Sequence, residues 1–151
     1  MPIDYKKYAS NWKTEIVPKV KARENNCCAF CGVKNYSVGY RKGSKFSPTA
    51  GNERHDKAGN GELPYKEARE LVNHCNEFAD DKLILIVLTV AHLDHDINNN
   101  DLSNLKALCQ KCHLNYDKDH HKKNSRQTIK NKKGIVDLPF PDFNQPQNPQ
   151  P

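Results

Sequence analysis

Two pairs of cysteines are the residues whose type and spacing most directly indicate chemistry in this sequence. Two residues separate the thiols within each pair, and the four thiols belong to Cys28, Cys31, Cys109 and Cys112. A C-x2-C turn can present both thiolates to one ion, and two such turns supply the tetrahedral set of sulfur ligands that suits Zn²⁺. We therefore predict that these four cysteines bind a structural zinc ion.

The cysteine pattern leaves other interpretations open. Residues 32–108 separate the two pairs, whereas the pairs of a zinc ribbon usually lie about 15–20 residues apart. Cys27 could replace Cys28 as a ligand, and a C-x2-C pair can also be a redox site or two buried thiols. Cys75 falls on the apolar face of a predicted helix and is expected in the core.

A second group of candidate ligands follows the most apolar run of the chain. It is the sequence His-Leu-Asp-His, which ends at His95. Alternate side chains of a strand share a face, so His92 and Asp94 would point one way and His95 the other unless the chain turns. Further on, His113 and Asp117 share one face of a predicted helix, which either supplies metal ligands or faces solvent.

The net charge of +6 arises from one segment of the sequence. Residues 118–134 contain seven Lys or Arg and one acidic residue, so the rest of the chain is neutral in sum. A local basic patch usually binds a polyanion, most often nucleic acid; a solvated helix that only aids solubility is the alternative. The side chains that we expect to contact DNA are those of Lys118, Lys122, Lys123, Arg126 and Lys130.

Composition and length exclude several classes of protein. Only 36% of the 151 residues are hydrophobic, against about 45–50% in a typical domain, so the core is small and a metal would help to hold it. The longest apolar run, residues 83–91, is much shorter than the ~20 residues of a membrane-spanning helix. No secretory signal is evident, so we expect a cytoplasmic protein without membrane contact, whose cysteines stay reduced.

The elements that must position these residues can be predicted in outline. Residues 1–24 form a helical lead-in that Pro18 breaks or kinks. Residues 33–82 form an insertion, extended at first with one short hairpin and then helical over residues 64–78. Residues 83–91 are rich in β-branched side chains and predict one buried strand.

The C-terminal part of the chain is predicted to be helical and then irregular. A helix begins at about Gln110 and continues into the basic segment 118–134. Residues 135–151 are rich in Pro, Gln and Asn, a composition typical of disordered chain.

The stretch from His95 to His113 resembles the HNH endonuclease family, in particular phage and bacterial members with two zinc knuckles. Its motif N-L-x-x-L-C-x-x-C-H begins at Asn104 and is matched at every fixed position. The resemblance covers residues 25–123 in outline and is tight over residues 88–117. It implies an α+β fold built on a ββα-metal finger, with a four-cysteine zinc site and extra N-terminal and insert helices. The first strand would end at His95.

The resemblance also implies a catalytic metal site. Asp94 and His113 would bind a divalent ion, and Asp117 would add a third ligand one helical turn further on. So few protein ligands leave positions open for phosphate and water, which suits Mg²⁺ or Mn²⁺, and a histidine ligand also admits Ni²⁺ or Zn²⁺.

The catalytic residues follow from the same resemblance. His95 would be the general base, Asn104 would hold the hairpin loop and so orient that histidine, and His92 would assist. A neutral imidazole, with a reference pKa of ~6.5, can accept a proton from water near neutral pH. We therefore expect a metal-dependent DNA endonuclease, and a zinc-knuckle module that binds DNA without cutting it is the alternative.

DNA is the expected partner, in the cytoplasm of a bacterial or phage-infected cell. Contact with the DNA backbone implies strong dependence on salt and little sequence selectivity. One HNH site cuts one strand, so cleavage of both strands would need a homodimer or a second event. The sequence leaves open whether the role is phage packaging with partner proteins, restriction, homing or recombination.

Overall fold

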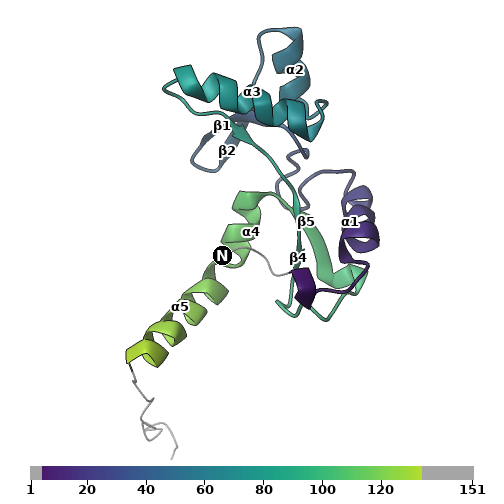
Figure 1. Cartoon of the computed structure of the whole chain (residues 1–151), viewed down its shortest axis with the longest axis vertical. Helices are drawn as coiled ribbons and strands as arrows, with labels where there is room; N and C mark the ends of the chain where they lie inside the picture. Colours follow the sequence, from purple (N-terminus) through teal and green to yellow (C-terminus); the bar gives the residue numbers. More distant parts are fainter. Residues whose placement is uncertain (1–4, 134–151) are drawn as a thin grey trace, which may run out of the picture. The chain divides into compact units, whose positions relative to one another are not determined.

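The structure is a computed structural model that describes residues 5–133 of the chain. The chain divides into two compact units, Met1–Tyr116 and Asp117–Pro151. The first unit contains two small β-sheets with helices packed on each, so the protein is of the mixed α+β class that the sequence predicts (Figure 1). The predicted irregular tail, residues 135–151, lies outside the described residues.

One sheet has three strands in the order β2-β1-β3. β1 (Val38–Lys42) and β2 (Lys45–Pro48) form the short hairpin predicted for the insertion, and β3 (Ile84–Leu85) pairs with the other edge of β1. Gly43 lies in the hairpin turn with a φ of 59°, a conformation that glycine adopts without strain.

Two helices pack on this sheet. α3 (Tyr65–Phe78) is the helix predicted for the insertion, whereas α2 (Glu53–Gly59) lies where the sequence predicts no helix. Asn52 accounts for α2, because its side chain accepts a hydrogen bond from the backbone N–H of His55 at 3.0 Å and so caps the first turn. The buried side chains of this half form one core: Val38, Ala58, Leu63, Ala68, Leu71, Val72, Leu83 and Leu85.

The second sheet is a two-stranded hairpin followed directly by a helix. β4 (Thr89–His92) pairs antiparallel with β5 (Leu105–Leu108), and α4 (Gln110–Tyr116) packs against both strands. α1 (Val17–Arg23) packs against the same two strands (Figure 1). Their shared core consists of Trp12, Val20, Cys28, Ile86, Leu88, Ala91, Leu105, Ala107, Leu108 and Cys109.

The N-terminal lead-in is helical but changes type where the sequence predicts a break. A π-helical turn over Trp12–Ile16 runs directly into α1. Pro18 lies in the first turn of α1, and because it has no backbone N–H it cannot continue the hydrogen-bond pattern of the preceding turn. The proline therefore marks the junction between the two helical types.

The apolar run 83–91 does not form the single strand that the sequence predicts. Its first part is β3 and its last part is β4, and these strands belong to different sheets. Between them, the N–H of Ile86 donates to the carbonyl of Ser37 at 2.9 Å, and the N–H of Leu88 donates to the Asn35 side chain at 2.9 Å. Between β3 and β4, the run therefore bonds to the loop that contains Asn35 and Ser37 and not to a neighbouring strand. The run contributes side chains to the cores of both sheets.

β4 ends at His92, before the point that the family resemblance implies, because the chain turns there. The N–H of His95 donates to the carbonyl of His92 at 3.2 Å, and His95 has a φ of 62°. The N–H of Leu93 still donates to the carbonyl of Asn104 at 2.9 Å, which extends the pairing of the hairpin by one bond. The turn removes the simple alternation of faces expected for an extended strand.

The second unit consists, as far as it is described, of α5 (Lys118–Lys133). Residues 118–129 are exposed around the whole helix, so contacts along its own surface must support it. One is the pair between Lys122 Nζ and Asp119 Oδ1 at 4.0 Å. The basic segment is helical, as the sequence predicts, and α4 and α5 are separate helices with Asp117 between them.

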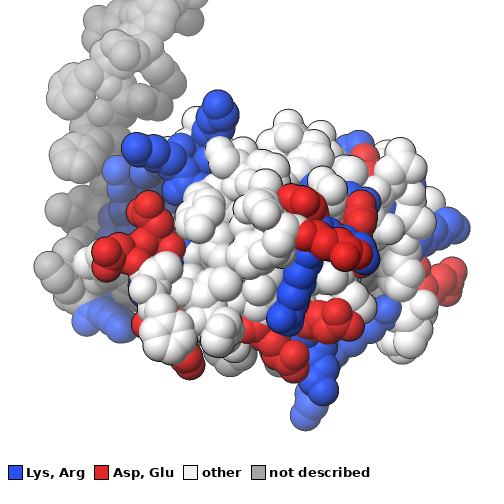
Figure 2. Space-filling model, turned by 90° about the horizontal axis from the view of Figure 1, so that it is seen from above, with Lys and Arg blue, Asp and Glu red and all other residues white. Residues whose placement is uncertain are grey.

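The distribution of charged side chains on the surface agrees with the composition of the sequence. Acidic and basic side chains lie interspersed on the face that Figure 2 shows. Outside residues 118–134 the two signs balance in the sequence as well. No helix within residues 5–133 combines the length and apolar character needed to cross a bilayer.

Candidate metal centre and polar loop

Four cysteine side chains meet between the turn after α1 and the start of α4. The sulfur atoms of Cys28, Cys31, Cys109 and Cys112 all lie within 4.8 Å of one another, and those of Cys31 and Cys109 are 3.7 Å apart. Sulfur atoms bound at roughly 2.3 Å to the corners of one tetrahedral zinc site would lie about 3.8 Å apart. The predicted cysteines therefore form a cluster that can hold a metal ion.

Backbone hydrogen bonds bring the two cysteine pairs together despite their separation in sequence. The N–H of Ala29 donates to the carbonyl of Ala107 in β5 at 2.8 Å, and the N–H of Cys109 donates to Sγ of Cys28 at 3.3 Å. Gly32, with a φ of 73°, closes the first turn by donating to the carbonyl of Cys28 at 2.8 Å. The three-stranded sheet and the helices α2 and α3 lie between the two pairs in the sequence.

The adjacent Cys27 lies outside the cluster. Its thiol donates to the carbonyl of Asn25 at 3.4 Å, and its backbone forms a β-bridge with Lys34. Cys28 is the cysteine of this pair that joins the other three sulfurs, with only 2% of its surface exposed. Cys75 packs against the core beneath α3, as the sequence predicts.

Burial and local hydrogen bonds shift the pKa of thiols in the cluster in different directions. Burial acts to raise the pKa of Cys28, but the N–H groups of Cys109, Cys31 and Phe30 donate to its sulfur and bring the pKa down to about 7. Burial raises the pKa of both Cys31 and Cys112, and neighbouring thiols raise that of Cys112 further. Four adjacent thiolates need a compensating cation, so the donor set fits a divalent ion.

Amide side chains hold the loop between β4 and β5. The Asp94 carboxylate accepts from the N–H of Asp96 and from Nδ2 of Asn104, both at 2.9 Å, and from Nδ2 of Asn99 at 2.7 Å. Oδ1 of Asn104 accepts in return from the N–H of Asp94 at 3.1 Å. These donors, the N–H of Asp96 foremost, lower the pKa of Asp94 to about 2. Asp94 is thus an ionised, exposed carboxylate with a fixed orientation.

Two further histidines lie close to α4: His113 is part of the helix, and His95, in the turn after β4, lies beside its last residue. The ring of His95 is exposed and lies 5.6 Å, between centroids, from that of Tyr116. The Tyr116 hydroxyl donates to the carbonyl of Leu93 at 2.5 Å and ties the end of α4 to the start of the loop. Nδ1 of His113 lies 2.8 Å from the Thr89 hydroxyl, so coordination by this imidazole would use Nε2.

His92 has a different environment from the other two histidines. It is buried and stacked on Trp12, with centroids 4.8 Å apart and the ring planes at 14°. Its Nε2 lies 3.1 Å from Oδ1 of Asn100 in the loop. His92 therefore lies in the core, and its contact with the loop runs through Asn100.

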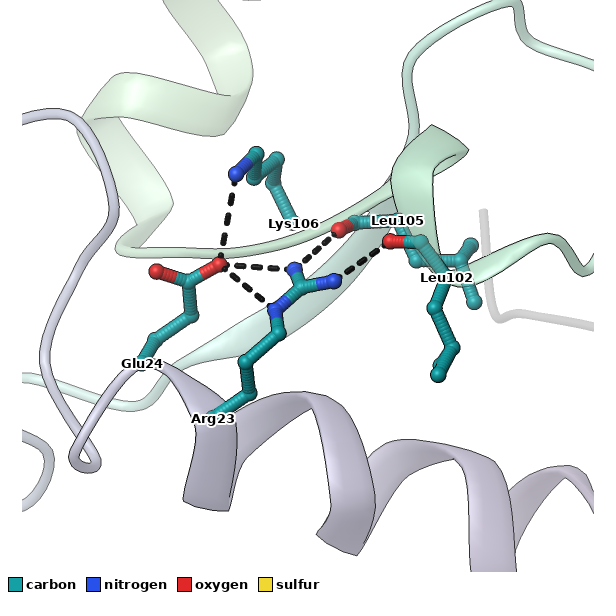
Figure 3. A network of polar contacts seen from close by, with 5 residues as sticks. All are labelled: Arg23, Glu24, Leu102, Leu105 and Lys106. Atoms are coloured by element: carbon teal, nitrogen blue, oxygen red, sulfur yellow. Dashed lines mark hydrogen bonds and ion pairs between the residues drawn. The ribbon is translucent and has the colours of Figure 1, made fainter.

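Arg23, at the end of α1, clamps the turn that carries Asn104 (Figure 3). Its guanidinium donates to the carbonyls of Leu102 at 2.5 Å and Leu105 at 2.6 Å, on either side of Asn104. Glu24 accepts from Arg23 at 2.7 Å, and this contact holds the pKa of Glu24 below its usual range. No spacing in the sequence points to Arg23, because its partners are backbone carbonyls of a distant segment.

The predicted catalytic ligands are not assembled like the cysteines. Within residues 5–133, the cysteine cluster is the one set of three or more Cys, His, Asp or Glu side chains whose ligand atoms lie close enough to share an ion. Asp94 and His113 belong to the first unit. Asp117 begins the second, where its carboxylate lies 3.8 Å from Nε2 of His121. The predicted DNA-contacting side chains all belong to α5.

No family model, curated protein sequence or solved structure matches this chain. Its function must therefore be inferred from its own residues and their contacts.

Proposed function

We propose that this protein is a metal-dependent DNA endonuclease of the HNH type, with β4, β5 and α4 as its ββα-metal finger. The observation that carries the proposal is the reciprocal contact of Asn104 with Asp94, in which the amide donates to the carboxylate and accepts from the backbone N–H. The family resemblance assigns loop orientation to Asn104 and metal binding to Asp94, and this contact supports that pair of roles.

The proposed catalytic ion would be held by Asp94 and His113, and Asp117 is the further ligand that the resemblance suggests. When bound there, such an ion would supply polarisation of the scissile phosphate and stabilisation of the leaving oxygen. Asp94 is suited to binding it because its carboxylate is ionised and exposed. The Thr89 hydroxyl at Nδ1 of His113 gives that imidazole the outer support common to histidine ligands. Mg²⁺ or Mn²⁺ suits this donor set best, and Ni²⁺ or Zn²⁺ is compatible with it.

His95 is the proposed general base, which would take a proton from the water that attacks phosphorus. The turn after β4 exposes its ring beside Tyr116, and Asn104 bonds to the residue that precedes it in the chain. A positioned general base contributes about 10²- to 10⁴-fold to the rate of such a step.

The cysteine cluster has a separate, structural role in this proposal. Four sulfur ligands complete the coordination of a zinc ion and leave no position for substrate. Zinc at this cluster would fix the first turn to the start of α4 and so support the hairpin. The basic helix α5 would add attraction to the DNA backbone through its exposed lysines and arginine.

A zinc-knuckle module that binds DNA without cutting it is the competing function. It accounts for the cysteines and for α5. It gives no reason for an ionised Asp94 held by three side-chain and backbone donors next to an exposed His95.

Cleavage of supercoiled plasmid by the zinc-loaded protein tests the proposal. Reactions without added ion and with Mg²⁺, Mn²⁺ or Ni²⁺ would be run for the parent, for His95→Ala and for His74→Ala. His74 is an exposed histidine on α3 and is the matched control. We expect ion-dependent nicked or linear product from the parent and His74→Ala, and a rate at least about 10²-fold lower from His95→Ala.

Equal rates for His95→Ala and the parent would contradict the assignment of the base. A shifted plasmid band without product in any ion would favour the binding module. The ratio of linear to nicked product at increasing protein concentration would report whether a dimer is needed to cut both strands.

A further inference from the structure

Three aromatic rings form a row on the surface of the first unit. The row begins at Phe30, between the cysteines of the first knuckle, passes through Tyr116 at the end of α4 and reaches His95. The Phe30 and Tyr116 centroids are 5.9 Å apart, and those of Tyr116 and His95 are 5.6 Å apart. Phe30 is 52% exposed and Tyr116 36%.

Hydrogen bonds hold the backbone at Phe30 and the hydroxyl of Tyr116, and both rings remain exposed. Phe30 lies within the turn that Gly32 closes, and its own N–H donates to Sγ of Cys28. The Tyr116 hydroxyl is bonded to the carbonyl of Leu93 at 2.5 Å, which fixes the ring against the loop. A single exposed phenylalanine is unremarkable on a protein surface, but two exposed rings next to a candidate catalytic residue, tilted at 56° to each other, offer aromatic faces to a flat ligand.

We propose that Phe30 and Tyr116 form a stacking platform for an unpaired nucleobase of the DNA substrate. The inference rests on the proposed function, because it requires the scissile phosphate to lie beside His95. The DNA strand would then continue from that phosphate along the three rings. Bases within a duplex are stacked on one another and do not offer their faces, so a base that stacks on an aromatic side chain must be unpaired or turned out.

Charge and chemistry favour a nucleobase over an apolar protein segment as the occupant. The basic segment, which carries the whole net charge of +6, begins two residues after Tyr116 in the chain, at Lys118. A cationic protein with exposed rings combines the two features of single-strand binding surfaces, namely attraction to the backbone and stacking of bases. The proposed substrate class is therefore DNA with a single-stranded or locally unpaired segment at the cleavage site.

Equilibrium binding tests this inference independently of cleavage. The zinc-loaded full chain, without added divalent ion, would be titrated into a fluorescently labelled single strand and into the blunt duplex of the same sequence. Phe30→Leu keeps an apolar side chain but removes the ring, and Phe78→Leu is the matched control at an 82% exposed phenylalanine on α3. We expect Phe30→Leu to weaken single-strand binding by about 5- to 150-fold and to leave duplex binding and zinc content unchanged.

Tyr116→Leu should give the same selective loss, and Phe78→Leu should match the parent on both DNAs. Equal losses on single strand and duplex, or a Phe30→Leu result no different from Phe78→Leu, would overturn the inference.

The parent should also cut a duplex with a short unpaired bubble faster than the fully paired duplex. Equal cutting of both would overturn the inference and leave the nuclease standing. A selective loss in binding with no cleavage of any DNA would overturn the nuclease and leave the stacking platform as a binding site.

Discussion

The cysteine cluster and the polar loop lie at opposite ends of one short hairpin, and they are held by different means. Cys109 follows β5 and Asn104 precedes it, so four strand residues separate the two sites. The cluster is fixed by backbone hydrogen bonds around two buried cysteines, Cys28 and Cys109. The loop is fixed by side-chain amides around an exposed carboxylate, Asp94. Buried sulfur ligands suit a structural ion, whereas an exposed and oriented carboxylate suits chemistry on a large substrate.

This difference implies that the two sites can be damaged separately. Loss of the cluster removes an organising centre from a chain with a small apolar core. Loss of contacts in the loop leaves both cores intact, because Asp94 and its partners contribute none of the buried hydrophobic side chains. Variants at the two ends of the hairpin should therefore separate stability from activity.

The largest effect is expected at the cluster, from Cys28→Ser compared with Cys27→Ser. A structural zinc site contributes on the order of 10 kcal/mol in small zinc domains, which is comparable to the whole stability of a domain. Cys28→Ser should therefore lose the zinc ion and the cooperative thermal transition of the first unit. Zinc per chain by mass spectrometry and melting followed by circular dichroism are the measurements.

Cys27→Ser should keep zinc and the parental transition, because its thiol bonds to Asn25 rather than to the cluster. A Cys28→Ser variant that retains one zinc ion and melts like the parent would show that Cys27 replaces its neighbour. In that case the first cysteine turn would be adaptable, and the cluster would not be held more rigidly than the loop.

The cysteine cluster could be predicted from the sequence almost completely, for a physical reason. Thiols two residues apart on a tight turn must point together, so Cys31, Cys109 and Cys112 are marked by spacing alone. The spacing predicts Cys28, which the structure confirms, but leaves Cys27 open as a replacement, because the choice depends on the bridge to Lys34 and on the turn at Gly32. Such contacts involve backbone groups that every residue carries.

The polar loop and the elements around it were less accessible to prediction. The motif marks Asp94 and Asn104, but Arg23 acts on carbonyl groups brought near it only by folding. The run 83–91 shows the same limit, because its composition predicts a strand but does not reveal that the strand divides between two sheets. Partners distant in sequence decide both outcomes.

An intermediate effect is expected from Arg23→Ala, with Arg69→Ala as the matched control. Arg23 braces the turn on both sides of Asn104, whereas Arg69 is an exposed arginine bonded to Tyr65 on α3. Support of this kind around a metal ligand typically changes affinity or activity by about 10- to 100-fold. We expect Arg23→Ala to lower the plasmid cleavage rate within that range, to require a higher Mn²⁺ concentration for half-maximal rate, and to keep the zinc ion.

Arg23→Lys should not rescue the rate fully, because an ammonium group cannot bond to both carbonyls with the geometry of a guanidinium. A variant that loses stability but keeps the parental dependence on Mn²⁺ would mean that Arg23 only holds the fold. In that case the loop would be more independent of α1 than the contacts in Figure 3 indicate.

The smallest effect is expected from the double variant Lys122→Gln and Lys123→Gln on α5, because these residues belong to neither end of the hairpin. Each lysine that neutralises a DNA phosphate adds about 0.9 to the slope of log affinity against log salt on duplex. The double variant should reduce that slope by about 1.8, with zinc content and the cleavage rate at saturating DNA unchanged.

Lys19→Gln with Lys66→Gln removes the same charge from exposed positions on α1 and α3 and should leave the slope at the parental value. Equal reductions from both double variants would mean that net charge, rather than a surface on α5, attracts the DNA. A reduced rate at saturating DNA would instead mean that the basic helix also orients the substrate at the loop. In that case activity would depend on α5 as well as on the polar loop.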